Sequence, residues 1–234
     1  TRVRSSAASD VYKRQLSGLE RLEVRGRDSA GLQILVWDHD LADVEIPEAR
    51  LNDLLFCSGS VRKSSNGSLL FVYKTASEIG DLGDNTNTLR ESIVSDDLLA
   101  KVLSGKNVKA NILGHTRWAS VGLISESNAH PVEASSTNKG LVTTVQNGDI
   151  DNYADLIASF ELEIPNGITT DARVVPELWQ KNITDGISSE DSFINTVRNF
   201  EGSVAIAGVD VSQPENIFLS VKGSGQALYV GLAE

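Results

Sequence analysis

Apolar residues recur at helical spacing in several stretches of the chain. Leu16, Leu19 and Leu22 lie three residues apart, and this spacing predicts a helix over residues 16–23. A second predicted helix covers residues 89–104 and ends before Gly105, a residue type that commonly stops helices. Two further predicted helices cover residues 151–160 and 192–200.

Short runs of apolar and β-branched residues predict the strands, because turn-forming Gly, Asp and Asn residues bound them. The strands come in hairpin-like pairs and do not alternate strictly with helices, so we expect mixed or antiparallel sheets in an α/β (α+β) fold. The predicted strands cover residues 32–37, 68–74, 110–113, 141–146, 203–209, 216–222 and 226–232.

Residues 1–15 differ from the rest of the chain. They are polar and rich in Ser, Ala and Arg, and they show no periodicity, so we predict a disordered or non-native leader. The chain contains no methionine and begins with Thr1, which either processing or truncation would explain. We expect a single folded domain over residues 16–234.

The net charge of −11 and the pI near 4.8 argue against two classes of partner. A nucleic-acid binder needs a basic face, and so does a protein that docks on anionic lipid. No apolar run approaches the roughly 20 residues of a membrane helix. Because Cys57 is the only cysteine, no intrachain disulfide can form, and a reducing cytoplasm is the expected location. His39 lies between two aspartates, a pattern more typical of a solvated turn than of a metal site, so we expect no metal.

Four short motifs stand out beside the predicted strands. Each has an ordinary structural explanation when taken alone: Asn-Gly after a strand is usually a tight turn, and an arginine is usually a surface charge. The motifs are VRGRDSAG (24–31), GHTRWASVG (114–122), SNAHP (127–131) and VQNGDIDN (145–152).

In this order the motifs resemble the class II glutamine amidotransferases of the N-terminal-nucleophile hydrolase superfamily. Within that family they are most similar to the glutaminase domain of the glutamine–fructose-6-phosphate aminotransferases, or glucosamine-6-phosphate synthases. The family shows C-G-I, then L-E-Y-R-G-Y-D-S-A-G, H-T-R-W-A-T-H-G, N-A-H-P, H-N-G-I-I-E-N and T-D-T-E. This chain has LEVRGRDSAG, HTRWASVG, NAHP, QNGDIDN and TTDARV, and the stretch between Asp38 and Lys109 matches only loosely.

The resemblance implies a four-layer αββα sandwich that hydrolyses glutamine to glutamate and ammonia. In the family an N-terminal cysteine attacks the carboxamide, and its own α-amino group, with a pKa of about 7.7–8, acts as the base. The oxyanion donors would be the side-chain amide of Asn147 and the backbone N–H of Gly148. Arg117 matches the residue that pairs with the glutamine carboxylate, and Asp171 matches the acid that takes its ammonium group.

The remaining family positions surround this centre. Trp118 and Ser120 match the loop that closes over the substrate. Arg25 and Gly26 match the turn beside the catalytic cysteine. The family histidines of HTRW and NAHP, which we expect to be supportive, correspond here to His115 and His130.

This chain departs from the family pattern at several positions. Val121 and Gln146 each stand where the family has histidine, which puts the affinity for glutamine in question. The family cysteine is absent, and Cys57 cannot replace it because the mechanism needs a free α-amine on the nucleophile. We therefore expect an N-terminally truncated amidotransferase domain that is inactive as given.

The resemblance also implies partners and alternatives. The expected ligand is L-glutamine, and no cofactor is needed. The full-length protein would carry a downstream sugar isomerase domain, in which the ammonia is transferred to fructose 6-phosphate. The full-length protein would also form a homodimer. The alternatives are the glutaminase domain of another class II amidotransferase and a non-catalytic glutamine-sensing domain.

Overall fold

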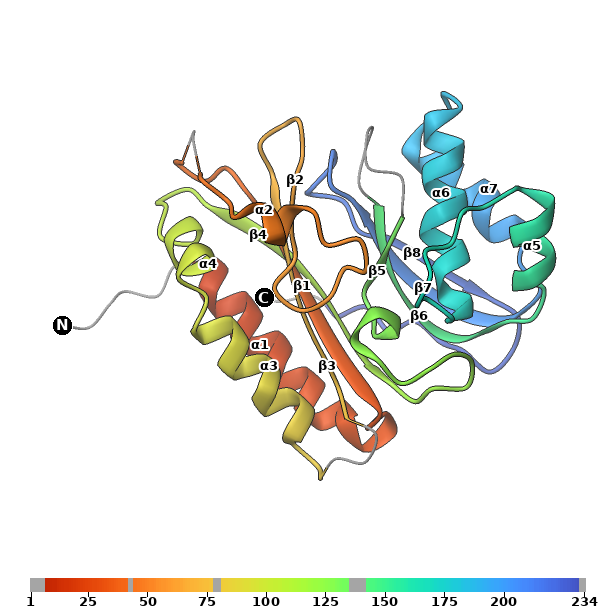
Figure 1. Cartoon of the computed structure of the whole chain (residues 1–234), viewed down its shortest axis with the longest axis horizontal. Helices are drawn as coiled ribbons and strands as arrows, with labels where there is room; N and C mark the ends of the chain where they lie inside the picture. The colour runs from red at the N-terminus through yellow and green to blue at the C-terminus, as the bar shows by residue number, and fades with distance from the viewer. Residues whose placement is uncertain (1–6, 42–43, 78–80, 135–141, 232–234) are drawn as a thin grey trace.

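Two antiparallel β-sheets lie face to face in the computed structural model, and helices cover the outer face of each sheet (Figure 1). The structure describes residues 7–41, 44–77, 81–134 and 142–231. The layer order helix, sheet, sheet, helix confirms the predicted αββα sandwich.

The first sheet has the strand order β2-β3-β1-β4, and all of its pairings are antiparallel. Its central strand β1 pairs along its length with β3 and β4, and Gly31 lies opposite both Lys74 and His115. The strands are β1 (Ser29–Trp37), β2 (Val61–Lys63), β3 (Leu69–Ala76) and β4 (Lys109–Arg117).

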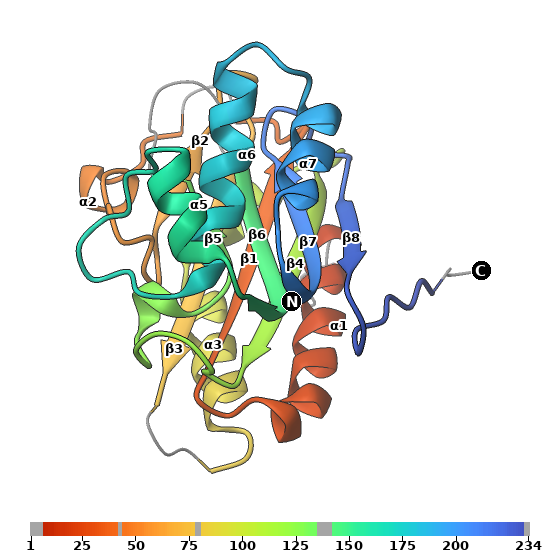
Figure 2. The same ribbon diagram turned by 90° about the vertical axis from the view of Figure 1, so that its right-hand side faces the viewer.

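The second sheet has the order β5-β6-β7-β8 and is also antiparallel throughout. Figure 2 shows α5, α6 and α7 in front of this sheet. The strands are β5 (Val132–Glu133), β6 (Val142–Ile150), β7 (Gly202–Asp210) and β8 (Phe218–Lys222).

The helices form the two outer layers. The first sheet is covered by α1 (Ala7–Leu22), α3 (Asp84–Val94) and α4 (Asp97–Val102), and the second by α5 (Tyr153–Ser159), α6 (Val174–Thr184) and α7 (Ser189–Arg198). The short elements are α2 (Glu48–Leu51) and the 3₁₀ turns η1 (Glu23–Arg25), η2 (Glu126–Asn128) and η3 (Asp171–Arg173). None of the helices in the described ranges is long and apolar enough to cross a membrane.

Three apolar clusters hold these layers together. One lies between the first sheet and its helices, and one lies between the second sheet and its helices. The third lies between the two sheets and includes Leu35, Val72, Leu113 and Val209. Strand side chains alternate between the two faces of a sheet, so each sheet contributes to one outer cluster and to this shared inner cluster.

Within the predicted disordered or non-native leader, Ala7–Gln15 form the first half of α1, and a non-native origin of the leader stays a prediction. Tyr12 packs against the outer apolar cluster one turn before Leu16, so the apolar face of the helix starts earlier than the leucine spacing suggests. Residues 1–6 of the predicted leader lie outside the described residues.

The predicted helix over residues 89–104 is two helices. The side chain of Asp96 accepts a hydrogen bond from the backbone N–H of Leu99, so it caps α4 and separates it from α3. The strand predicted over residues 226–232 is wrong for residues 226–231, which have no strand partner among the described residues. Helix α6 was not predicted, and Pro176 in its first turn obscures the pattern.

Candidate functional site

The first two motifs meet at one end of the first sheet. Ser29 at the start of β1 lies opposite Arg117 at the end of β4. The backbone N–H of Asp28 donates to the carbonyl of Arg117, and the Asp28 carboxylate accepts from the N–H of Ala119 at 2.8 Å. A side chain at Gly26 would come within 2.8 Å of the Arg117 backbone. Glycine therefore allows the turn before β1 to pack on the loop after β4.

The NAHP motif joins this end of the sheet to the TTDARV segment. The Asn128 side-chain oxygen accepts from the backbone N–H groups of Thr169 and Thr170 at 2.7 and 3.1 Å. The His130 ring lies 4.5 Å from the His115 ring, measured between centroids. The motif thus contacts both HTRW and the segment that carries Asp171.

The fourth motif is part of strand β6 and contacts Asp171 directly. The Gln146 side-chain amide donates to Asp171 Oδ2 at 2.8 Å, and the backbone N–H of Ile150 donates to the same oxygen at 2.9 Å. The Gln146 backbone N–H donates to His130 Nδ1 at 3.2 Å. All the sequence motifs therefore converge at one place, where the ends of β4 and β6 lie together.

Asn147 and Gly148 do not form a hairpin turn, since both residues lie within β6 and pair with β7. Gly148 has a φ of 96°, which favours glycine, and a Cβ at this position would collide with the carbonyl of Ser203. The Asn147 side chain is exposed, between buried Gln146 and half-buried Gly148.

The predicted site residues divide into an exposed rim and a buried wall. Trp118 is 74 % exposed, and Arg25 and Asn147 are also exposed. The residues of the wall lie behind the rim. Four of them are buried, namely Arg117, His130, Gln146 and Asp171, and the fifth, His115, is a partly buried residue of β4. The site residues come from several elements, as expected for a site at strand ends, and β6 contributes to both the wall and the rim.

The Arg117 guanidinium is directed at its own loop. It donates to the carbonyl of Leu123 at 3.2 Å and to the carbonyl of Val121. Burial lowers the pKa of Arg117, while Asp171 and Asp28 act against this effect. Arg117 thus orders the loop that carries Trp118 and Ser120, in addition to any contact with a ligand.

Both histidines of the wall are neutral at pH 7. Burial lowers the pKa of His115 to about 4, with a smaller contribution from Arg117. Burial also lowers the pKa of His130 well below its usual range, and electrostatic repulsion from His115, when protonated, and from Arg117 and Lys74 lowers it further. The two rings therefore provide hydrogen-bonding and packing surface, without a positive charge.

Burial raises the pKa of the Asp171 carboxyl above its usual range, and the negative charge of Asp149 raises it further. The hydrogen bonds from the Ile150 N–H and from Gln146 act in the opposite direction. Asp149 was missed by the sequence analysis. It accepts a hydrogen bond from the Ser120 hydroxyl, so it connects the loop after β4 to strand β6. Its position directly after Asn-Gly was the signal available in the sequence.

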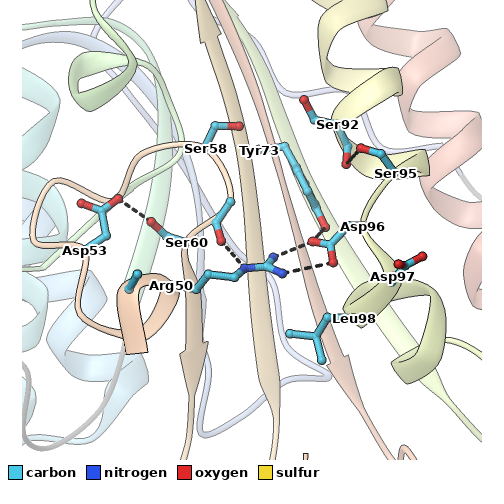
Figure 3. A pocket seen from close by; sticks show the side chains of 12 residues that line it. Arg50, Asp53, Ser58, Ser60, Tyr73, Ser92, Ser95, Asp96, Asp97 and Leu98 are labelled. Carbon is cyan, nitrogen blue, oxygen red and sulfur yellow. Dashed lines mark hydrogen bonds and ion pairs between the residues drawn. The ribbon is translucent and has the colours of Figure 1, made fainter. Parts of the chain in front are cut away.

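A separate hollow lies between α2, β3 and α4, away from these motifs (Figure 3). Its volume is about 630 Å³. Asp96 accepts two hydrogen bonds from Arg50, at 3.1 and 2.5 Å, and one from the Tyr73 hydroxyl at 2.8 Å. Because these charged groups satisfy one another, the hollow is part of the structural framework at this edge of the sheet.

The other residues considered in the sequence are placed elsewhere. Cys57 is a half-buried free thiol in the loop between α2 and β2, and burial raises its pKa. His39 Nε2 lies 2.8 Å from the carbonyl of Gly67, as part of a turn. The described residues contain no group of three or more His, Cys, Asp or Glu side chains placed to hold a metal ion.

Curated relatives agree with the motif pattern. No family model matches the chain. A glutamine–fructose-6-phosphate aminotransferase (isomerizing) of Geobacillus kaustophilus is 31% identical over 226 residues, which cover 96% of this chain and 29% of the relative. An enzyme of the same name from Bacillus thuringiensis subsp. konkukian is 29% identical over 222 residues, which cover 95% of this chain and 29% of the relative. The chain thus spans less than a third of the length of these relatives.

Solved structures agree on the fold. Glutamine phosphoribosylpyrophosphate amidotransferase from B. subtilis superposes with a TM-score of 0.53 at 19% sequence identity, covering 88% of this chain and 33% of that chain. A structure described as the allosteric regulatory enzyme of purine biosynthesis superposes with a TM-score of 0.51, also at 19% identity, covering 85% of this chain and 33% of the other. The curated relatives, whose matches cover 95–96% of this chain, show together with the converging motifs that the chain belongs to the class II, N-terminal-nucleophile glutamine amidotransferases.

Proposed function

We propose that the site at the ends of β4 and β6 binds L-glutamine. Asp171 takes the α-ammonium group, Arg117 with Ser120 faces the α-carboxylate, and the carboxamide lies at Asn147 and Gly148. The observation that carries this proposal is the convergence of all the motifs through Gln146 and Asp171 (2.8 Å) and through Asn128 and the TTDARV segment.

In hydrolysis, the Asn147 side-chain amide and the Gly148 backbone N–H stabilise the oxyanion that forms when a nucleophile attacks the carboxamide. A rigid strand suits this role, because donors that are placed in advance need no reorganisation in the transition state. Trp118 and Arg25 lie at the exposed rim, where they can close over a bound ligand.

The whole protein's activity extends the same proposal. Ammonia released here aminates fructose 6-phosphate in a downstream sugar isomerase domain, and the full-length protein is a cytoplasmic homodimer. The names of the curated relatives support the amination of fructose 6-phosphate, and their greater length supports a downstream domain.

Isothermal titration calorimetry with L-glutamine tests the ligand directly and needs no nucleophile. We expect binding by the unmodified chain and at least a tenfold loss in Asp171→Asn, because the ammonium group loses its charged partner. Asp155→Asn, an exposed aspartate on α5, is the matched control and should bind normally. Equal affinity in Asp171→Asn would remove Asp171 from the site. A companion assay of ammonia release, made on a variant that carries an N-terminal cysteine, separates a glutaminase from a domain that only senses glutamine.

A further inference from the structure

Gln146 connects two parts of the proposed glutamine site. Its side-chain nitrogen donates both to Asp171 Oδ2, at 2.8 Å, and to the carbonyl of Gly148, at 3.0 Å. The side chain is 3 % exposed, so water cannot readily replace these bonds. The side-chain amide of Gln146 therefore links Asp171, which would bind the ammonium group, to Gly148, which would bind the oxyanion.

The same oxygen of Asp171 is held from a second direction. The backbone N–H of Ile150 donates to Oδ2 at 2.9 Å, whereas Oδ1 makes a long contact of 3.4 Å with the Thr170 hydroxyl. The backbone N–H of Ala172 also stabilises the ionised carboxylate, more weakly than the Ile150 N–H does. Two donors on Oδ2 fix the plane of the carboxylate. Oδ1 is then the oxygen with capacity left for a ligand donor.

Charged groups on neighbouring strands act on this carboxylate in opposite directions. Asp149, on β6, carries a like charge that disfavours ionisation of Asp171, and Arg117, on β4, carries an opposite charge. His115 and His130, the other titratable groups of the wall, are neutral at pH 7. Asp149 also accepts the Ser120 hydroxyl, so its charge is held close to the site.

We propose that Gln146 is a positioning residue that fixes the Asp171 carboxylate against the Gly148 strand, and that Gln146 and Asp149 together decide the pH range in which the site accepts an ammonium group. The ligand part of this inference rests on the proposed glutamine site. Gln146 favours the ionised carboxylate by donating to it. Asp149 opposes that form by repulsion.

The free protein provides the first test. The carboxyl carbon of Asp171 is followed by ¹³C NMR across a pH titration, with Asp171→Asn used to assign the signal. Replacing the donor in Gln146→Leu should raise the midpoint by about one pH unit, and removing the like charge in Asp149→Asn should lower it by about half a unit. Because Asp149 is only half-buried, its variant keeps the test available if Gln146→Leu does not fold.

Two further variants separate positioning from a general effect on the fold. Gln33→Leu makes the same change at a buried glutamine of the other sheet, and it should leave the Asp171 midpoint unchanged. Gln146→His returns a ring N–H donor and should restore part of the shift. Equal midpoints in the unmodified chain, Gln146→Leu and Asp149→Asn would overturn the inference, as would shifts of the same sign in the two variants.

The second test is calorimetric titration with L-glutamine across the same pH range. The pH at which binding is half lost should move up in Gln146→Leu and down in Asp149→Asn, following the NMR midpoints. Absence of binding by the unmodified chain at every pH would refute the proposed glutamine site and leave the NMR result to decide the role of Gln146. Binding whose pH dependence is the same in all variants would refute this inference alone.

Discussion

Lys74 is a charged residue in a buried environment that its side chain disfavours. It lies on the inner face of β3, it is 2 % exposed, and its Nζ has no hydrogen-bond partner among the described residues. The ammonium group lies 4.8 Å above the Phe56 ring. Burial lowers its pKa to about 7, although the negative charge of Glu133 opposes this effect. A buried cation without a close partner reduces the stability of the fold.

Lys74→Met should therefore stabilise the protein, and by an amount that depends on pH. Between pH 7 and about 10.5 the unfolded chain binds a proton that the folded chain lacks, so the free energy of unfolding of the unmodified protein rises with pH in this window. Below pH 7 Lys74 is protonated in both the folded and the unfolded chain, so the full free-energy cost of burying its charge remains. We expect a gain of about 1–4 kcal/mol at pH 6 that shrinks toward pH 10.

Urea unfolding at pH 6 and pH 9.5 measures this gain. Lys101→Met, a change at an exposed lysine of α4, is the control and should keep the pH dependence of the unmodified protein. A Lys74→Met variant that is less stable at pH 6, or whose gain is the same at both pH values, would show that the buried charge is not what limits stability.

At the level of the elements, strand β1 connects the two sheets through a glycine. Gly31 lies between Lys74 and His115 in the register of the first sheet. The carbonyl of His130, just before β5 of the second sheet, occupies the place where a Cβ of residue 31 would be. The segment that leads into the second sheet can pack on β1 only because residue 31 has no side chain.

Gly31→Ala should lower the free energy of unfolding by roughly 1–3 kcal/mol or more, because the obstacle is backbone and not a flexible side chain. Gly18→Ala is the matched control: nothing lies within 4 Å of a Cβ at this position in α1, and alanine should raise stability by roughly 0.5–1 kcal/mol. Thermal unfolding of both variants measures the effects. Equal changes of the same sign would mean that the contact with His130 does not constrain β1.

The helices and strands also show which parts of the fold could be predicted from the sequence alone. Periodicity predicted the cores of β1, β3, β4, β6 and β7, because each places a face of apolar residues between layers. It failed at Ser95–Asp96, where a single capping side chain divides a helix, and at residues 226–231, where a strand pattern has no neighbour to pair with. Capping and pairing depend on partners that a linear pattern does not contain.

Some features of the candidate site could be predicted from the sequence and others could not. The motifs named Arg117, Asn147, Gly148 and Asp171, and the structure brings these segments together. The sequence could not indicate that Arg117 would donate to the carbonyls of its own loop, or that Asp149 would accept the Ser120 hydroxyl. The first feature depends on how the loop after β4 folds back on Arg117, and the second on the contact of that loop with β6, which is adjacent to it only in the folded sandwich.

On the scale of the whole molecule, the two sheets share one interior. The inner apolar cluster draws residues from β1, β3 and β4 on one side and from β6 and β7 on the other. An ion pair crosses the same layer: Arg62 of β2 donates to both carboxylate oxygens of Glu133 of β5, at 2.9 and 2.5 Å. We therefore expect the two sheets to unfold in a single transition, with circular dichroism and tryptophan fluorescence reporting the same midpoint.

Glu133→Leu tests whether this ion pair holds the sheets together. The change leaves Arg62 buried without its carboxylate and removes the charge that most favours protonated Lys74, so we expect a loss of about 3–5 kcal/mol in the free energy of unfolding. The double variant Arg62→Met/Glu133→Leu replaces the pair with apolar side chains and should recover most of that loss. Some deficit should remain, because Arg62 also donates to the carbonyls of Leu51 and Asp53 at 3.0 and 2.6 Å. If the double variant is as unstable as Glu133→Leu, the carbonyl bonds of Arg62 matter more than its pairing with Glu133. If the two spectroscopic midpoints separate in Glu133→Leu, the ion pair is what makes the two sheets unfold together.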